Sequence, residues 1–449
     1  MTLRKLIFWP HLLAGLLAGL VILVMSVTGV LLTYERQLIV WADSHFQSTS
    51  TERYPQRADV AVVLQQLMAA HPDVQPATVT FARDPKKPIT IAAGQRTFFA
   101  DAYTGALLGE STGTMRKAMS DLRSWHRWLA VDGDGRTTAR AVTGWSNLLF
   151  AFIVLSGMYL WLPKAWTWIQ FRVVLLFNGK VRGKARDFNW HNVIGIWSAV
   201  PLFIVVVSAV PISFPWANAA VYKAMGEPVP AGRGGGGGER GRGEGPVRRS
   251  LGEGGPRAAG REGDAGERRR QGGPGREERA QGGAGRERGT RAEAEGGGRR
   301  GGGADAPPDV ERLGRLLSLA EQQEPAWRTI ALRLPANSAA PVSFNIDRGD
   351  GGQPHLRSTL TLVRATGAID TYETFAAQTP ARRLRSILRF AHTGEVLGIP
   401  GQTIAGLVTA GSVVLVWTGI ALSLRRFRAW VARRSRRTAQ QPLPADSAA

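Results

Sequence analysis

Four uninterrupted apolar segments constrain this chain more than any other feature of its sequence. They contain no charged residue and are 21, 21, 22 and 21 residues long: Leu12–Leu32, Val142–Leu162, Val193–Phe214 and Ile404–Leu424. About 20 apolar residues in a helix cross the hydrocarbon core of a bilayer, and a backbone in lipid must pair its own polar groups. The sequence therefore predicts four membrane-spanning helices. The first is too long for a signal peptide and lacks a small-x-small cleavage site, so we interpret it as a retained span.

Basic residues predict the orientation of the four spans. The residues before the first span, the segment 163–190 and the tail after Leu424 carry net charges of +2, +5 and +6. Short basic segments of this kind stay in the cytoplasm, whereas long segments cross the membrane largely regardless of their charge. We therefore expect both termini and 163–190 in the cytoplasm, and the long segments 33–141 and 215–403 outside it.

Two compositional features exclude whole classes of function. The chain has no cysteine among its 449 residues, which rules out disulfide scaffolds, thiol catalysis, Cys-ligated zinc and iron–sulfur clusters.

Gly232–Gly303 holds 28 of the 54 glycines and 17 arginines but no aromatic residue, so it has no apolar face to bury. This composition predicts a disordered spacer. RNA binding by arginine–glycine repeats is the alternative, but the predicted topology places the segment outside the cytoplasm, so we expect no nucleic-acid partner.

The two halves of the chain run in the same order: span, extracytoplasmic segment, span. Self-similarity of this kind indicates an internal duplication. The matching features are an H-x-x-x-G start (His11–Gly15 and His191–Gly195), a histidine before the second span (His126 and His392) and a hydroxyl–glycine pair near its end (Ser156-Gly157 and Thr418-Gly419). The glycine of that pair follows the histidine by 31 positions in the first half (His126 to Gly157) and by 27 in the second (His392 to Gly419). The difference predicts an insertion near Thr137–Arg140.

Each extracytoplasmic segment predicts a small α+β module of about 50–60 residues, because an amphipathic helix precedes alternating strands and a Thr-Gly turn. We expect helices at Val60–Ala70 and Val310–Gln322. The expected strands are Ala77–Phe81, Ile89–Ala93, Thr97–Asp101 and Ala106–Leu108 in the first module, and Thr329–Leu334, Val342–Asp347, Ser358–Val363 and Ala368–Thr371 in the second.

Together these patterns predict a membrane protein: a four-helix transmembrane bundle in two repeated halves, with two small α+β extracytoplasmic modules and a disordered Gly/Arg-rich spacer. The predicted parts in chain order are span 1 (1–34), module 1 (35–115), an approach helix with span 2 (116–162), a basic loop (163–190), span 3 (191–214), a connector (215–231), the spacer (232–303), module 2 (304–385), an approach segment with span 4 (386–424) and a basic tail (425–449).

Four of the seven histidines occupy equivalent ends of the spans. His11 and His191 lie at the predicted cytoplasmic ends, whereas His126 and His392 lie on the extracytoplasmic approaches. An ionisable residue at membrane depth is a functional candidate, and pairs of histidines on facing helices hold haem in four-helix bundles. The pattern predicts one pair at each membrane face, His11 with His191 and His126 with His392. The other three, His45, His71 and His355, are interpreted as structural or surface residues.

Other interpretations of these histidines stay open at this point. A histidine near the end of a span commonly hydrogen-bonds to water or lipid headgroups. Zinc or copper would require nearby carboxylate or sulfur ligands, and the spans offer none. Three glycines, Gly15, Gly19 and Gly195, would let a flat macrocycle approach the helices, and they would serve equally well as helix-packing positions.

The chain resembles the family of PepSY-associated transmembrane proteins. The resemblance rests on the H-x-x-x-G spans, the stretch Trp125-His126-Arg127-Trp128-Leu129, the Gly-Arg turn that follows it and the hydroxyl–glycine span ends. The stretch DAYTGALLG at 101–109 resembles the end of a PepSY module, and Arg364–Ile369 is a weaker second copy. The resemblance covers nearly the whole chain except Gly232–Gly303 and the tail.

Members of that family include inner-membrane proteins of iron-starved bacteria, some of which reduce ferric siderophores through b-type haems held by histidines. The resemblance thus implies a multi-pass protein of the bacterial inner membrane with two b-type haems, and electron transfer to a ferric siderophore or another periplasmic acceptor. Carried over residue by residue, it implies that the axial iron ligands are His11, His126, His191 and His392.

Two other functions remain open at this point. One is a non-redox PepSY protein that binds or restrains a periplasmic partner such as a peptidase. The other is a haem b membrane subunit of a different periplasmic oxidoreductase. The sequence contains no flavin or nicotinamide motif, so quinol or a separate cytoplasmic reductase would have to supply electrons.

Overall fold

The computed structural model describes residues 2–49, 56–162, 167–230, 312–335 and 340–439. The predicted spacer, Gly232–Gly303, therefore lies outside the described residues, and its disorder stays a prediction.

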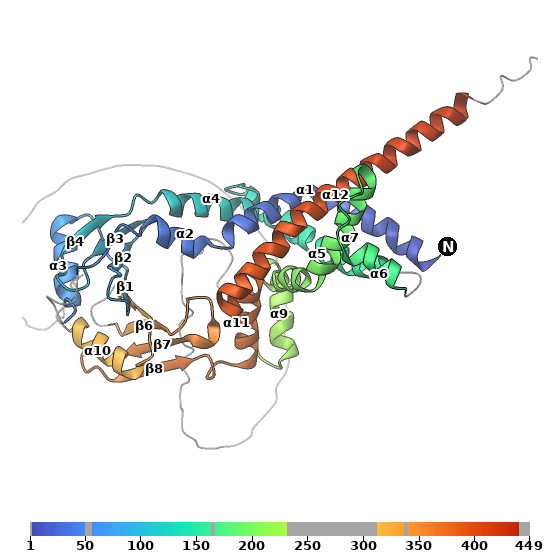
Figure 1. Ribbon diagram of the computed structural model, residues 1–449. Coiled ribbons are helices and arrows are strands. Elements are labelled where there is room, and N and C mark those ends of the chain that lie inside the picture. Colours follow the sequence, from blue (N-terminus) through green and yellow to red (C-terminus); the bar gives the residue numbers. More distant parts are fainter. Residues whose placement is uncertain (1, 50–55, 163–166, 231–311, 336–339, 440–449) are drawn as a thin grey trace, which may run out of the picture. The chain divides into compact units, whose positions relative to one another are not determined.

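Within those ranges, four helices are long and apolar enough to cross a membrane. They are α1 (Leu3–Leu32), α5 (Gly135–Trp161), α7 (Gly183–Ser208) and α12 (Gly398–Ala439). α1 packs against α5 and α12, and α7 packs against the same two helices, so the four form a closed bundle (Figure 1). The predicted spans on α1, α5 and α12 fall on these helices to within one residue, whereas the third, Val193–Phe214, runs six residues past the end of α7 at Ser208. The helices also continue past the apolar segments into charged residues at several ends.

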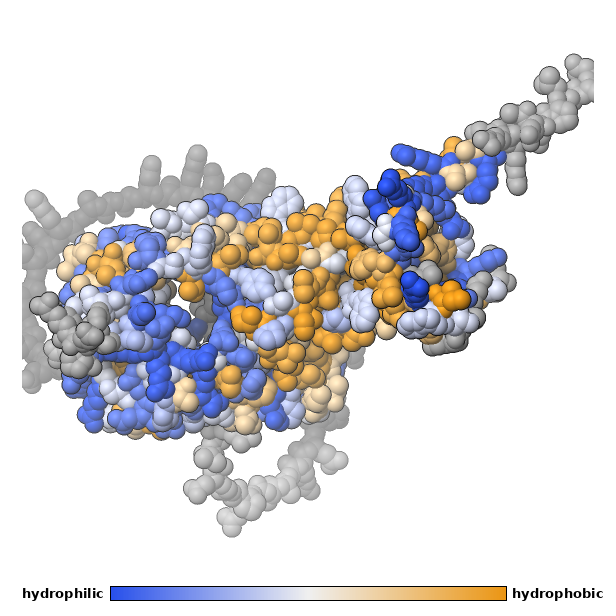
Figure 2. Space-filling model, in the orientation of Figure 1, coloured by the Kyte–Doolittle hydropathy of each residue, from blue (hydrophilic) through white to orange (hydrophobic). Residues whose placement is uncertain are grey.

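The outer surface of the bundle is apolar. Leu17 and Leu20 on α1 expose 70% and 71% of their surface, and Trp417 on α12 exposes 68%. Figure 2 shows apolar residues spread over the bundle helices, with strongly hydrophilic residues on the C-terminal extension of α12. Contiguous apolar surface of this extent is unfavourable in water and matches the hydrocarbon interior of a bilayer. The chain is therefore a membrane protein.

In each half, one further helix leads towards the second span. α4 (Thr114–Trp128) packs against α1 and α5, and α11 (Pro380–His392) packs against α7. α7 is followed by the single turn α8 (Val210–Ser213) because Pro211 has no N–H to continue the helix. The sequence analysis did not predict the shorter helices α2 (Glu35–Ala42), α6 (Trp168–Leu175) and α9 (Pro215–Ala224), nor the 3₁₀ turns η1 (Pro354–Leu356) and η2 (Glu395–Leu397).

The extra residues between His126 and Gly157 fall mainly before α5. His126 precedes the first residue of α5 by nine positions, whereas His392 precedes the first residue of α12 by six. Gly157 lies 22 positions after the first residue of α5, and Gly419 lies 21 positions after the first residue of α12. The longer spacing in the first half is therefore mostly a longer connection between helices, rather than an insertion at Thr137–Arg140 inside α5.

The strands of the described chain join in a single antiparallel sheet of eight, in the order β4-β3-β2-β1-β5-β6-β7-β8. β1 and β5 pair in the centre, with Val79 opposite Leu332. The sequence predicted the separate strands to within a few residues but not their union. The strands are β1 (Thr78–Ala82), β2 (Ile89–Ala93), β3 (Arg96–Ala100), β4 (Leu107–Glu110), β5 (Thr329–Arg333), β6 (Val342–Asp347), β7 (Arg357–Leu362) and β8 (Ile369–Thr374).

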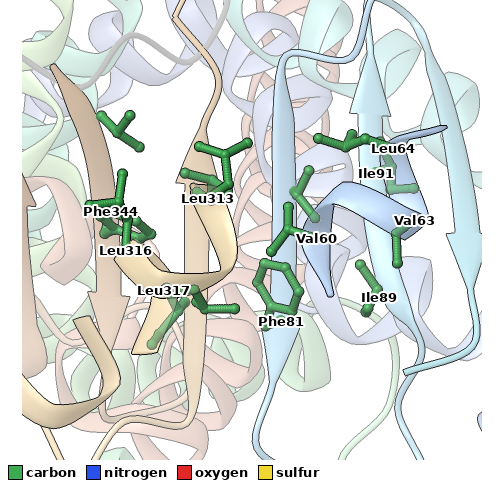
Figure 3. Close-up of a cluster of buried hydrophobic side chains, with 14 of the residues drawn as sticks. Val60, Val63, Leu64, Phe81, Ile89, Ile91, Leu313, Leu316, Leu317 and Phe344 are labelled. Atoms are coloured by element: carbon green, nitrogen blue, oxygen red, sulfur yellow. The ribbon is translucent and has the colours of Figure 1, made fainter. Parts of the chain in front are cut away.

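The core of this module lies between the sheet and two helices, α3 (Val60–Ala70) and α10 (Leu313–Gln323). Figure 3 shows their apolar side chains facing strand residues such as Phe81 and Phe344. Alternation along β1 and β6 sends every second residue into this core. Asp59 caps α3 by accepting a hydrogen bond from the Ala61 N–H at 2.8 Å.

Candidate functional site

The structure places the four candidate histidines on four different helices. His11 lies on α1 and His191 on α7, whereas His126 and His392 lie near the C-terminal ends of α4 and α11. Each pair combines one residue from the first half of the chain with one from the second.

His126 and His392 face each other. Their ring centroids are 6.1 Å apart and the ring planes are inclined by 48°. Both imidazoles line a cavity with a volume of about 50 Å³. Its other lining is mainly apolar, with Ile22, Met25, Phe150 and Leu202 among the residues, and none of its described lining residues is an acid, lysine or arginine.

The hydrogen bond of His392 fixes which ring nitrogen carries the proton. Its Nδ1 lies 2.8 Å from the carbonyl oxygen of Val205 on α7. A carbonyl can only accept, so Nδ1 must donate its hydrogen. In a neutral ring the lone pair is then on Nε2.

The same tautomer follows for the other three histidines, because each has Nδ1 within 2.8–3.0 Å of a hydroxyl oxygen. Each of these hydroxyls also donates its only proton to the carbonyl four residues earlier in its own helix, at 2.6–2.8 Å. It can therefore only accept from the histidine. The pairs are His11 with Ser156, His126 with Thr28 and His191 with Thr418. Among the described residues, the hydrogen bonds of all four rings use Nδ1 and leave Nε2 available.

These residues fit haem iron. A metal-ligating histidine normally donates its second N–H to a carbonyl or similar group, which orients the ring. Two imidazoles on opposite sides of one metal, with bonds of about 2 Å and ring radii of roughly 1 Å, have centroids ~6 Å apart. The observed 6.1 Å agrees with this separation.

Tetrahedral zinc fits less well. It would bring two imidazole centroids to about 5 Å, and it takes three or four protein ligands. In the part of the chain that the structure describes, no group of three or more His, Asp or Glu residues could hold a metal ion.

Burial keeps the imidazoles of the α4–α11 pair neutral. It lowers the pKa of His126 to about 4, and repulsion from a charged His392 contributes to the shift. Burial also lowers the pKa of His392, although the hydrogen bond to Val205 opposes that effect. Neutral imidazole is the form that ligates metals.

His11 on α1 and His191 on α7 lie towards the opposite ends of these helices from Thr28 and Val205, which contact the other pair. Each is held by a hydroxyl of the second span of its own half, Ser156 on α5 or Thr418 on α12. Gly15, one turn after His11, has open space where a side chain would lie. Gly19 and Gly195 instead face apolar side chains of α12, so they occupy helix-packing positions.

The remaining histidines lie elsewhere. His45 packs against Phe46 with its ring tilted and the ring centroids 4.1 Å apart, His71 ends α3, and His355 is exposed in η1.

Sequence reasoning missed two groups that orient the histidines. One is Thr28 with the adjacent Gly29, which repeats the hydroxyl–glycine pattern already noted in the second spans. A search of the sequence for further hydroxyl–glycine pairs in the spans could have identified Thr28. The other is the carbonyl of Val205, which carries no sequence signal because every residue has one.

The fold and the facing histidines define a multi-helix membrane protein with an attached sheet module. Comparison with protein families gives a match over residues 8–426 to the family described as the PepSY-associated TM region. Since the match covers most of the chain, the protein belongs to the PepSY_TM family, as the sequence resemblance predicted. The comparison with curated proteins found no match.

Proposed function

We propose that this chain is a haem-containing electron-transfer protein of the bacterial inner membrane, with both termini in the cytoplasm, and that it reduces ferric siderophores on the periplasmic side. The observation that carries the proposal is the geometry of His126 and His392. Their rings face each other at 6.1 Å across an apolar cavity, and hydrogen bonds at Nδ1 leave each Nε2 free to ligate iron.

The four histidines divide into two ligand pairs. His11 and His191 hold one b-type haem, and His126 and His392 hold the second. Bound haem supplies a one-electron Fe(III)/Fe(II) couple at each position. Thr28, which contacts the second pair, follows His11 by 17 positions on α1, or about 25 Å along the helix axis. The two sites therefore lie at different depths, as transfer across a membrane requires.

The protein orients the imidazole ligands and surrounds them with mainly apolar side chains. Apolar side chains such as Phe150 and Leu202 form most of the remaining lining of the cavity that His126 and His392 share. None of the described lining residues is an acid, lysine or arginine, and the polarity around a haem is one of the means by which a protein sets its potential.

The overall reaction balances as a one-electron reduction. Each ferric ion in the siderophore accepts one electron and becomes Fe(II), which binds hard oxygen ligands less tightly. A quinol donor gives two electrons and releases two protons as it becomes quinone, so one quinol serves two ferric ions. A separate cytoplasmic reductase is the other class of donor.

Reoxidation of the reduced protein by a ferric chelate tests this function. The purified protein is reduced with dithionite, freed of excess reductant without oxygen and mixed with a ferric hydroxamate, while Fe(II) is trapped by a coloured chelator. We expect about one Fe(II) for each haem oxidised. His126→Ala should abolish the fast phase, because it removes the haem nearest the acceptor.

Two outcomes would contradict the proposal. A protein without a Soret band would be a non-redox binder. A haem protein that stays reduced in the presence of the chelate would serve a different oxidoreductase.

A further inference from the structure

We infer that Thr28, Ser156 and Thr418 are positioning residues for the ligand imidazoles, and that the helix break at Pro211 does the same for His392. This inference rests on the proposed function, since it assigns the residues that hold the haem ligands in place.

The first device is a hydroxyl residue followed by glycine. Thr28 accepts the Nδ1–H of His126 at 3.0 Å. A Cβ added at the next residue, Gly29, would lie 3.3 Å from Cε1 of the same imidazole. The hydroxyl therefore orients the ring while the glycine leaves room for its edge.

The same device holds two other histidines. Ser156 accepts from His11, and a Cβ at Gly157 would lie 3.4 Å from the His11 Cε1. Thr418 accepts from His191, and a Cβ at Gly419 would lie 3.6 Å from the His191 Cε1. Three independent hydroxyl–glycine pairs thus meet three imidazoles in the same way.

The fourth histidine is held by a different device. Ser208 and Ala209 follow His191 by the same number of positions as Thr28 and Gly29 follow His11, but Ala209 brings a Cβ where the first half has none. Among the described residues, no hydrogen bond joins the Ser208 hydroxyl to His392. Both Ser208 Oγ and His392 Nδ1 instead donate to the carbonyl of Val205, at 2.9 and 2.8 Å.

α7 ends at Ser208, which leaves the Val205 carbonyl without its usual partner from the helix backbone. In a continuing helix the N–H of Ala209 would bond to Val205, but here it bonds to the carbonyls of Val206 and Val207. Pro211 explains the break, since its ring clashes with the carbonyl four residues earlier and it has no N–H. A backbone carbonyl replaces the missing hydroxyl–glycine pair.

These contacts have a consequence for the redox couple. Donation from Nδ1–H makes the imidazole a stronger ligand and favours ferric iron. Loss of the acceptor should therefore weaken haem binding and raise the potential of that haem alone.

The test compares Thr28→Val, which keeps the shape but removes the acceptor, with Thr28→Ser, which keeps the hydroxyl. Haem retention through gel filtration and a spectroelectrochemical titration are the readouts. We expect Thr28→Val to lose haem affinity by roughly 10–100-fold. Each tenfold shift in preference towards Fe(II) raises the midpoint by 59 mV. Thr28→Ser should restore both values.

Pro211→Ala should act on the same spectral component, because a restored helix would return the Val205 carbonyl to the Ala209 N–H. Ser156→Ala and Thr418→Val should act on the other component. Ser26→Ala is the matched control. Ser26 also lines the cavity on α1, but its hydroxyl accepts from Ser412 rather than from a histidine.

Two results would overturn the inference while leaving the proposed function intact. One is a Thr28→Val protein with two haems of unchanged affinity and potential. The other is an equal effect of Ser26→Ala, which would indicate general packing. If the wild-type protein binds no haem, the proposed function fails first.

Discussion

The first helix of each half, α1 and α7, presents a histidine near its start and an acceptor for a second histidine near its end. In α1 the acceptor is the side chain of Thr28, and the helix continues to Leu32. In α7 it is the backbone carbonyl of Val205, and the helix stops at Ser208. The comparison shows that one orienting contact can come from a side chain in a regular helix or from the backbone at a break.

The two halves also divide the work in the same way. In the first half, α1 orients the histidine of α4, and α5 orients the histidine of α1. In the second half, α7 orients the histidine of α11, and α12 orients the histidine of α7. Each half thus orients its own two imidazoles, but neither half contains a complete pair. Facing rings arise only where the halves meet, as His126 and His392 do.

The largest expected effect comes from removing one ligand of a pair. His126→Ala and His392→Ala should each remove the same haem and leave the other spectrally intact, although the two residues lie in different halves. His11→Ala and His191→Ala should each remove the second haem. The double variant of a pair should lose no more than either single one, because half of a two-histidine site is already broken.

Reduced-minus-oxidised spectra and haem content per chain check this pairing. Variants His11→Ala and His392→Ala that lost the same component would disprove the pairing. So would four single variants that all retained two haems.

An intermediate effect is expected from exchanging the residues that differ between α1 and α7. In Gly29→Ala the new Cβ would lie 3.3 Å from both the His126 Cε1 and the Thr409 Cγ2, so these neighbours must give way by a few tenths of an ångström. We expect haem retention to fall roughly tenfold. Ala209→Gly should leave haem retention unchanged, because His392 is held by the Val205 carbonyl. Equal losses in both variants, measured by gel filtration, would show that the two helices do not differ as described.

The smallest effect concerns the sheet module. Asp101 begins the Thr-Gly turn of the first half, whereas Val363 stands at the matching place in the second. Burial alone would raise the pKa of Asp101, but N–H groups of Thr104, Thr49 and Tyr103 donate to its carboxylate and lower the pKa to about 2. A depressed pKa contributes stability above the ordinary value near 4, and this contribution is lost as the pH falls through about 2.

Asp101→Asn should therefore destabilise the protein by about 1–3 kcal/mol at neutral pH, since an amide group would face backbone donors. The difference from wild type should shrink as the pH falls from about 4 to 2. Thermal unfolding of the full chain in detergent, followed by tryptophan fluorescence, measures it. A difference that stays constant with pH would show that the carboxylate charge does not stabilise this turn.

Much of the fold followed from sequence because its signals are local. Apolar length predicted the spans, and alternation predicted strands such as Ile89–Ala93 and Val342–Asp347 at the positions observed. The pairing of β1 with β5 was not predictable in this way, since it joins residues about 250 positions apart with no periodic signal. The Val205 contact was also missed, because a backbone carbonyl is present in every residue and carries no sequence signal.

The central claim is that each chain holds two haems, each between one histidine of the first half and one of the second. Haem stoichiometry of the purified full-length protein, measured from its oxidised and dithionite-reduced absorption spectra against protein concentration, tests it most directly. The account predicts two six-coordinate, low-spin b-type haems per chain. A protein with no haem, or with a single haem per chain, would contradict it.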